Sequence, residues 1–183
     1  MSVFSSLIDQ AEVIKVLQEA VIASRNDSDT TQAMTHAWLF TGPPGSGRSN
    51  AAVAFAAALV CKEGGCSKCN DCMSTITGSH ADVELIKTEG LSIKIDEIRE
   101  LISRASWAPS VSNWRVVVIE DSDRLTDSAA NALLKVIEEP GLRTVWLLCA
   151  PTLTDVLPTI RSRCRHLSLR TPSTKAISNL LIT

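Results

Sequence analysis

The sequence predicts one α/β domain in which a five-stranded parallel sheet carries helices on both faces. Three observations predict this fold. Short apolar runs typical of buried strands alternate with helical stretches, the loop after the first run is rich in glycine, and that loop leads directly into a helix. Strands that alternate with helices pair in parallel through right-handed crossovers. The 183 residues suffice for one compact core.

The first element expected is a helix, because apolar residues recur at steps of three and four over 7–23. The polar segment 24–35 that follows is typical of a loop. Further helices are expected over 49–60, 95–105 and 127–138. Strands buried on both faces are expected over 37–41, 83–87, 115–119, 144–149 and 166–169.

Charge and hydropathy exclude several classes of protein. The chain has 18 basic and 20 acidic residues, a formal net charge of -2. It therefore has no overall electrostatic drive toward nucleic acid or an anionic membrane. The longest strongly apolar stretch, 51–61, is too short to cross a bilayer, and the N-terminus lacks the pattern of a signal peptide. We expect a cytoplasmic protein that does not contact a membrane.

A phosphate-binding loop is expected after the first strand. Residues 42–49 read Gly-Pro-Pro-Gly-Ser-Gly-Arg-Ser and fit G-x-x-x-x-G-K-S/T except at Arg48, which replaces lysine. Glycines let backbone N–H groups converge on phosphate, the helix N-terminus adds positive potential, and a serine hydroxyl reaches Mg²⁺. The residues expected to hold ATP and Mg²⁺ are Gly42, Gly45, Gly47, Arg48 and Ser49.

Two observations weaken this nucleotide site. The guanidinium of Arg48 is planar and larger than an ammonium, so we expect hydrolysis to suffer more than binding. Glu120 and Asp121 follow the third strand in the reverse of the Asp-Glu order that an active ATPase uses to hold metal and orient water. Metal affinity can survive this reversal, but catalytic geometry is sensitive to errors of about 1 Å. A glycine-rich turn without ligand and a solvated acidic turn are the alternatives.

Four cysteines lie close together in the sequence. Cys61, Cys66, Cys69 and Cys72 have the spacing C-x4-C-x2-C-x2-C. Four thiolates complete a tetrahedral Zn²⁺ shell at about 2.3 Å, which leaves no position for water, so the expected zinc is structural. Metal binding, worth on the order of 10 kcal/mol in small zinc modules, would order a polar insert that has few apolar residues. An iron–sulfur cluster and free thiols are the alternatives.

Further motifs carry a resemblance that spans nearly the whole chain. Leu-Ile-Asp-Gln stands at 7–10, with Asp9 at a place usually held by glycine; Ala-Asn-Ala-Leu-Leu-Lys at 130–135 runs on to Glu-Glu-Pro at 138–140; and Ser-Arg-Cys stands at 162–164. Together with the cysteine knuckle, these motifs resemble the clamp-loader subunits of bacterial DNA polymerase III, which are AAA+ proteins with a P-loop NTPase-type domain.

The resemblance implies the domain boundaries and one catalytic residue. Residues 1–170 would form the AAA+ nucleotide-binding-type domain, with the zinc knuckle 61–72 inserted, and 171–183 would begin a truncated lid domain. Arg163 would be an arginine finger, catalytic in trans on the γ-phosphate held by a neighbouring subunit. A structural salt bridge is the alternative role for this arginine.

The resemblance also implies a function. The site differs from that of an active ATPase in three ways: arginine replaces the lysine at position 48, the carboxylates are reversed, and the apolar Cys149-Ala150 stands where a polar sensor is expected. In these respects the chain resembles the delta-prime type of subunit more than the gamma/tau motor. Such a subunit belongs to the DNA polymerase III holoenzyme, a nucleotidyltransferase, and helps to load the sliding clamp onto primed DNA during replication.

The implied partners are the gamma/tau and delta subunits and, through the complex, the sliding clamp and primer-template DNA. ATPase activity of the chain itself is expected to be weak or absent. Two other functions stay open: a catalytically active clamp-loader ATPase of the gamma/tau type, and a zinc-dependent nucleic-acid-binding module.

Overall fold

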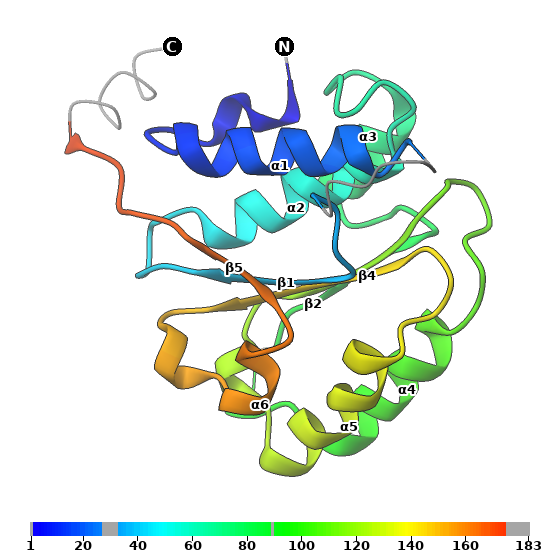
Figure 1. Ribbon diagram of the computed structural model, residues 1–183, viewed down its shortest axis with the longest axis vertical. Helices are drawn as coiled ribbons and strands as arrows, with labels where there is room; N and C mark the ends of the chain where they lie inside the picture. The colour runs from blue at the N-terminus through cyan, green and yellow to red at the C-terminus, as the bar shows by residue number, and fades with distance from the viewer. Residues whose placement is uncertain (1, 27–32, 89, 175–183) are drawn as a thin grey trace.

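The computed structural model describes residues 2–26, 33–88 and 90–174. Its centre is a five-stranded parallel sheet with the strand order β2-β3-β4-β1-β5 (Figure 1). The strands are β1 (Ala37–Thr41), β2 (Val83–Ile86), β3 (Arg115–Ile119), β4 (Thr144–Ala150) and β5 (Arg165–Ser168). The predicted fold class is confirmed. Most of the expected beginning of a lid domain, 175–183, lies outside the described residues.

Helices cover both faces of the sheet (Figure 1). One face carries α1 (Ala11–Ala23), α2 (Arg48–Val60) and α3 (Asn70–Ile76); the other carries α4 (Ile95–Ala105), α5 (Asp127–Glu138) and α6 (Pro158–Arg161). Short 3-10 turns are η1 (Val3–Ser6), η2 (Ser122–Arg124) and η3 (Leu153–Asp155). Among the described residues, no helix has the length and apolarity needed to span a membrane.

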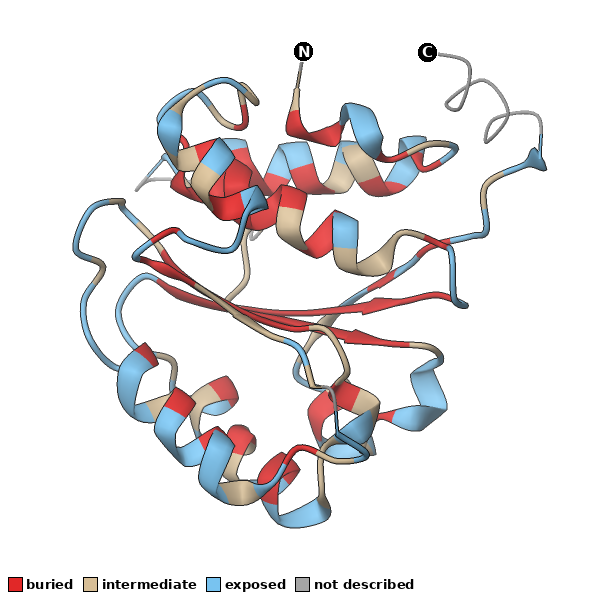
Figure 2. Cartoon of the chain, turned by 180° about the vertical axis from the view of Figure 1, so that it is seen from behind, coloured by how far each residue is buried: buried red, intermediate tan, exposed pale blue. Residues whose placement is uncertain are grey.

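The sheet divides the core into two layers, one against each set of helices (Figure 2). Side chains alternate between the faces along each strand. Trp38 and Phe40 therefore enter the layer beneath α1 and α2, whereas Leu39 enters the layer above α4 and α5. Trp38 also meets Phe55 of α2 edge to face, with ring centroids 5.1 Å apart. Each layer is a continuous apolar cluster.

Burial on both faces was expected for all five strands, and this expectation is wrong for two of them. Every residue of β1, β3 and β4 is buried, but most residues of β2 and β5 are partly or fully exposed. The cause is position: β2 and β5 are the edges of the sheet. An edge strand has one neighbour, so the helices cover it less completely.

The first helix begins later than its periodicity predicts. Residues 7–10 carry the apolar spacing of a helix, but α1 starts at Ala11. Asp9 has a φ of 57°, which breaks a right-handed helix. The preceding residues instead form η1, whose Phe4 is buried.

The periodicity analysis also missed α3 and α6, which have 7 and 4 residues. Local capping rather than an apolar stripe defines them. The sulfur of Cys69 accepts the N–H of Cys72 at the start of α3, and Pro158 opens α6 at a position where its missing N–H costs nothing.

Candidate functional site

The loop between β1 and α2 has the geometry of a phosphate cradle. Gly45 and Gly47 have φ values of 83° and 81°, which glycine adopts without strain. Gly42 cannot carry a side chain, because a Cβ there would lie 2.9 Å from the carbonyl oxygen of Leu169. The N-terminus of α2 points its free N–H groups into this loop. An open cavity of about 320 Å³ lies here, lined by Pro44, Gly45, Gly47, Arg48, Ser49 and Asn50.

Arg48 folds back onto the loop that precedes it. Its Nη1 donates a hydrogen bond of 2.8 Å to the carbonyl oxygen of Gly42. Its Nε is buried and has no hydrogen-bond partner within the described part of the chain. The residue that departs from the phosphate-loop motif therefore directs one of its donors at the loop's own backbone. A bound phosphate would have to compete with that contact.

The reversed carboxylates lie at the same end of the strands as the phosphate loop. Glu120 and Asp121 follow β3, the phosphate loop follows β1, and the carboxyl ends of parallel strands lie on the same side of a sheet. The charges of Glu120, Asp121 and Arg48 all affect the pKa of the Cys149 thiol on β4. Burial raises its pKa well above the usual range, the negative charges of Glu120 and Asp121 raise it further, and the positive charge of Arg48 opposes them. The structure thus brings Arg48, Glu120 and Asp121, which are far apart in the sequence, near one buried thiol.

Arg163 stands apart from this group. It follows α6, which lies on the opposite face of the sheet from α2 (Figure 1). Its guanidinium is 39% exposed, lies 2.6 Å from a carboxylate oxygen of Glu138 and donates a hydrogen bond of 2.8 Å to the carbonyl oxygen of Thr159. These contacts are all on α5 and α6, so the arginine faces solvent and not the chain's own phosphate loop.

The four cysteines of the predicted knuckle converge. Their sulfur atoms all lie within 4.8 Å of one another, and none of the six cysteines is in a disulfide. The Cys61 sulfur is 3.8 Å from that of Cys66 and 3.6 Å from that of Cys69. A tetrahedral shell with Zn–S bonds of about 2.3 Å has sulfurs about 3.8 Å apart. The four residues can therefore hold one metal ion, and their spacing fits zinc.

Backbone N–H groups support the sulfurs of this cluster. Glu63, Cys69 and Cys72 donate their N–H groups to the sulfurs of Cys61, Cys66 and Cys69, each at 3.4 Å. Burial alone raises the pKa of Cys61, but hydrogen bonds from nearby N–H groups outweigh burial and lower that pKa to about 6. Thiolates are the form that binds metal, so these N–H groups favour ligation at Cys61, whereas burial raises the pKa of Cys69 and of Cys72.

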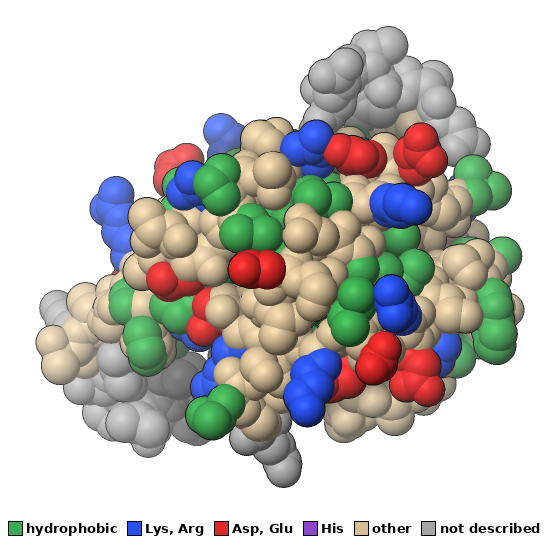
Figure 3. All heavy atoms as spheres, turned by 90° about the horizontal axis from the view of Figure 1, so that it is seen from below, with side chains coloured by type: hydrophobic (Ala, Val, Ile, Leu, Met, Phe, Trp, Pro, Cys, Tyr) green, Lys and Arg blue, Asp and Glu red, His purple; other side chains and the backbone are tan. Residues whose placement is uncertain are grey.

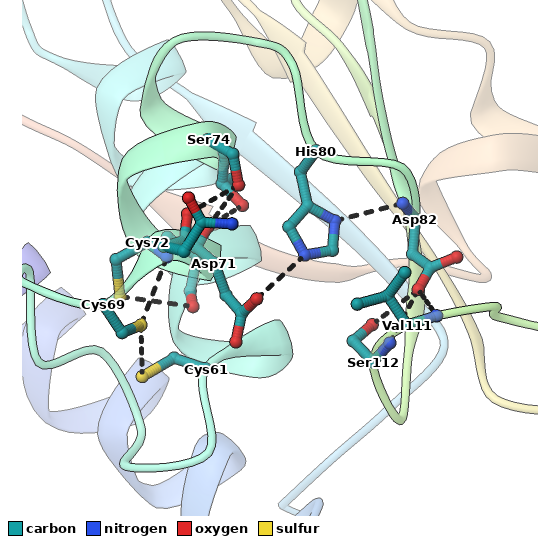
Figure 4. A network of polar contacts seen from close by, with 12 residues as sticks. Cys61, Cys69, Asp71, Cys72, Ser74, His80, Asp82, Val111 and Ser112 are labelled. Carbon is teal, nitrogen blue, oxygen red and sulfur yellow. Dashed lines mark hydrogen bonds and ion pairs between the residues drawn. The ribbon is translucent and has the colours of Figure 1, made fainter.

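A polar network that the sequence analysis missed connects the knuckle to a distant loop (Figure 4). Asp71 lies within the knuckle, and its carboxylate is 3.7 Å from Nε2 of the buried His80. Nδ1 of His80 accepts the N–H of Asp82 at 3.0 Å. The carboxylate of Asp82 then accepts N–H groups from Ser110 and Ser112 at 2.7 Å each. No motif marks these residues, because only the fold brings them together.

The comparison with known proteins assigns the chain to a family. A family model described as DNA polymerase III, delta subunit matches residues 11–173. The chain belongs to this family. It is 35% identical over 176 residues to DNA polymerase III subunit delta' of Bacillus subtilis (strain 168), an alignment that covers 94% of this chain and 51% of that protein. It is 31% identical over 179 residues to subunit tau of the same organism, covering 95% of this chain and 30% of that protein.

Solved structures support the AAA+ fold of this family member. The chain matches a gamma-subunit-related protein of Thermotoga maritima with a TM-score of 0.59 at 24% identity, over 90% of this chain and 47% of that one. It matches a variant of Thermotoga maritima RuvB with a TM-score of 0.66 at 18% identity, over 95% of this chain and 49% of that one. The chain spans about half the length, or less, of these relatives.

Proposed function

We propose that the chain is an assembly subunit of the DNA polymerase III clamp loader, with a degenerate ATP site of its own, that completes the ATP site of a neighbouring subunit. In this role it helps to load the sliding clamp onto primed DNA during replication. Its partners are the gamma/tau and delta subunits. Residues 1–170 form the AAA+ domain in this proposal, and 171–183 begin the lid.

The chemistry around the phosphate loop supports weak or absent turnover. The guanidinium of Arg48 bonds to the carbonyl of Gly42, whereas a lysine ammonium would offer a compact charge to phosphate. Glu120 and Asp121 differ in length from the Asp-Glu pair that positions metal and water, and the neighbouring Cys149 is fully buried and cannot act as a polar sensor. Turnover of ATP by the chain itself is therefore expected to be weak or absent, and binding of ATP and Mg²⁺ is expected to suffer less than hydrolysis.

The observation that carries the proposal is the separation of Arg163 from its own nucleotide site. The partly exposed guanidinium follows a helix on the far face of the sheet, and this position supports a role on another subunit's phosphate. Its present partner, Glu138, is itself 47% exposed, so this ion pair is weak and exchangeable. A positioned guanidinium stabilises charge that develops on transferred phosphoryl oxygens.

Steady-state ATPase assays test this proposal. We expect negligible turnover from the chain alone and robust turnover from the complex reconstituted with gamma/tau and delta. Arg163→Ala should lower turnover at the completed site by about 10³-fold, the smaller of the effects seen for arginine fingers. Arg161→Ala is the matched control, because Arg161 lies on α6 and bonds to the carbonyl of Leu153. Unchanged ATPase in the Arg163→Ala complex would contradict the trans role, and brisk turnover by the chain alone would favour the gamma/tau alternative.

The knuckle holds a structural zinc ion in this proposal. Cys61, Cys66, Cys69 and Cys72 would fill its four positions and leave no site for substrate. The ion would order the insert, so no step of nucleotide chemistry passes through it. The formal net charge of -2 argues against the alternative of a nucleic-acid-binding zinc module. On the opposite side of the domain from the knuckle, drawn in Figure 3, acidic and basic side chains are interspersed.

A further inference from the structure

Two polar side chains near the N-terminus join segments that are far apart in the sequence. Asp9 and Gln10, in the turn between η1 and α1, both bond to the segment 170–173 that follows β5. Gln10 Nε2 donates a hydrogen bond of 2.6 Å to the carbonyl oxygen of Arg170, and Gln10 Oε1 accepts a hydrogen bond of 3.4 Å from the Arg170 N–H. Asp9 Oδ2 accepts the N–H of Ser173 at 2.9 Å and its hydroxyl at 2.8 Å.

The backbone of Asp9 has a conformation that favours glycine, so the carboxylate is not needed for the turn itself. Its φ of 57° is a conformation that glycine adopts freely and that aspartate tolerates better than most other residues. A glycine here would make the same turn but could not accept a hydrogen bond from Ser173. The backbone and side-chain bonds from Ser173 hold the pKa of Asp9 below its usual range, so the carboxylate is charged at neutral pH.

Gln10 also reaches the phosphate loop. Its side chain is 5% exposed, and Nε2 lies 3.5 Å from the carbonyl oxygen of Ser46 in that loop. One buried amide thus touches both the phosphate loop and the segment that leads out of the domain. Figure 1 shows that the orange-to-red chain after β5 runs up on the same side as the turn before α1. The three segments meet at one corner of the domain.

We propose that Asp9 and Gln10 form a clasp that fixes segment 170–173 to the N-terminal turn and, through Gln10, to the phosphate loop. This inference rests on the proposed function, because a subunit that braces its neighbours without turning over ATP must hold one shape. Asp9 and Gln10 are positioning residues, since they act through the outgoing segment and not on nucleotide.

Amide hydrogen exchange of the chain tests the clasp. In Asp9→Gly we expect the amide of Ser173 to exchange about fivefold faster, the effect of losing one ordinary hydrogen bond. Glycine relaxes the backbone at this φ, so faster exchange cannot result from added strain. Asp9→Asn keeps an acceptor oxygen and tolerates the turn, and it should restore most of the protection.

Two outcomes would overturn the clasp. They are an unprotected Ser173 amide in the unaltered chain and the same exchange rate in Asp9→Gly. Neither of them bears on the role of Arg163, which is read from turnover in the complex. The clasp and the proposed function can therefore fail separately.

Discussion

The carboxylate of Asp82 organises the loop between α4 and β3. Its oxygens accept N–H groups from Ser110, Val111 and Ser112, each at 2.7 Å, and Arg115 Nη2 lies 3.4 Å away. Asp82 is 0% exposed. Burial alone raises its pKa, but the three N–H groups outweigh burial and hold the pKa well below its usual range. The loop therefore depends on one charged group.

Replacing this group should destabilise the domain. Asp82→Asn leaves the N–H groups and Arg115 facing a neutral amide, and we expect the free energy of unfolding to fall by about 3 kcal/mol. Urea denaturation at neutral pH measures this loss. Asp96→Asn is the control, because that carboxylate is 88% exposed. A loss below about 0.5 kcal/mol would show that the loop does not need the charge.

The same group sets a pH dependence. Because folding lowers the pKa of Asp82, its contribution to stability is present above the unfolded pKa of about 3.9 and is lost as pH falls from there toward the folded value. The unaltered domain should lose stability steeply below about pH 4, and Asp82→Asn should show a shallower slope. Equal slopes in the two proteins would contradict this assignment.

The knuckle and α3 form a unit with little apolar content of its own. Met73 and Ile76 of α3 are about half exposed, and the buried contacts of this unit are made by Cys61, Cys72 and Thr75. Sulfur–metal bonds would replace the missing core. By contrast, α2 is buried around most of its surface through its alanines, so it needs no metal.

Loss of one ligand should therefore disorder the knuckle and spare the domain. Native mass spectrometry should find one zinc ion on the unaltered chain and none on Cys66→Ser. Hydrogen exchange should become faster over 61–76 while β1, β3 and β4 stay protected. Cys164→Ser is the control: it removes a thiol outside the cluster, whose pKa burial raises to about 12, and should keep the ion. Retention of zinc by Cys66→Ser would refute four-cysteine ligation, and iron in the preparation would favour the iron–sulfur alternative.

The domain as a whole has two apolar layers that share one sheet. Leu17 of α1 lies in one layer and Leu133 of α5 in the other, and both are 0% exposed. Strands β1, β3 and β4 contribute side chains to both layers, so neither layer can form without the sheet. This arrangement predicts one cooperative unfolding transition.

Substitutions in the two layers should lower the same transition. Leu17→Ala and Leu133→Ala should each cost about 2–5 kcal/mol, and their effects should add in the double variant because the side chains lie on opposite faces of the sheet. Urea unfolding followed by tryptophan fluorescence and by circular dichroism measures this. Separate midpoints from the two probes, or two resolved transitions, would show that the layers unfold independently.

The order of the sequence by itself determined the fold class, the phosphate loop and the cysteine cluster. Each of these depends on local information: apolar runs that alternate with helical periods, glycines at set places before a helix, and four thiols within a few residues. Such patterns can be recognised without knowledge of which strands are neighbours in the sheet. The same information could not identify β2 and β5 as edges, because edge position is a property of strand order.

Only the tertiary structure decided what distant side chains do. It separated Arg163 from the phosphate loop and joined Asp9 to Ser173. It also buried Asp82 among the N–H groups of a loop that begins more than twenty residues later. The physical reason is that a hydrogen bond or ion pair depends on distance and direction in space, and neither is encoded in the spacing of residues so far apart in the chain.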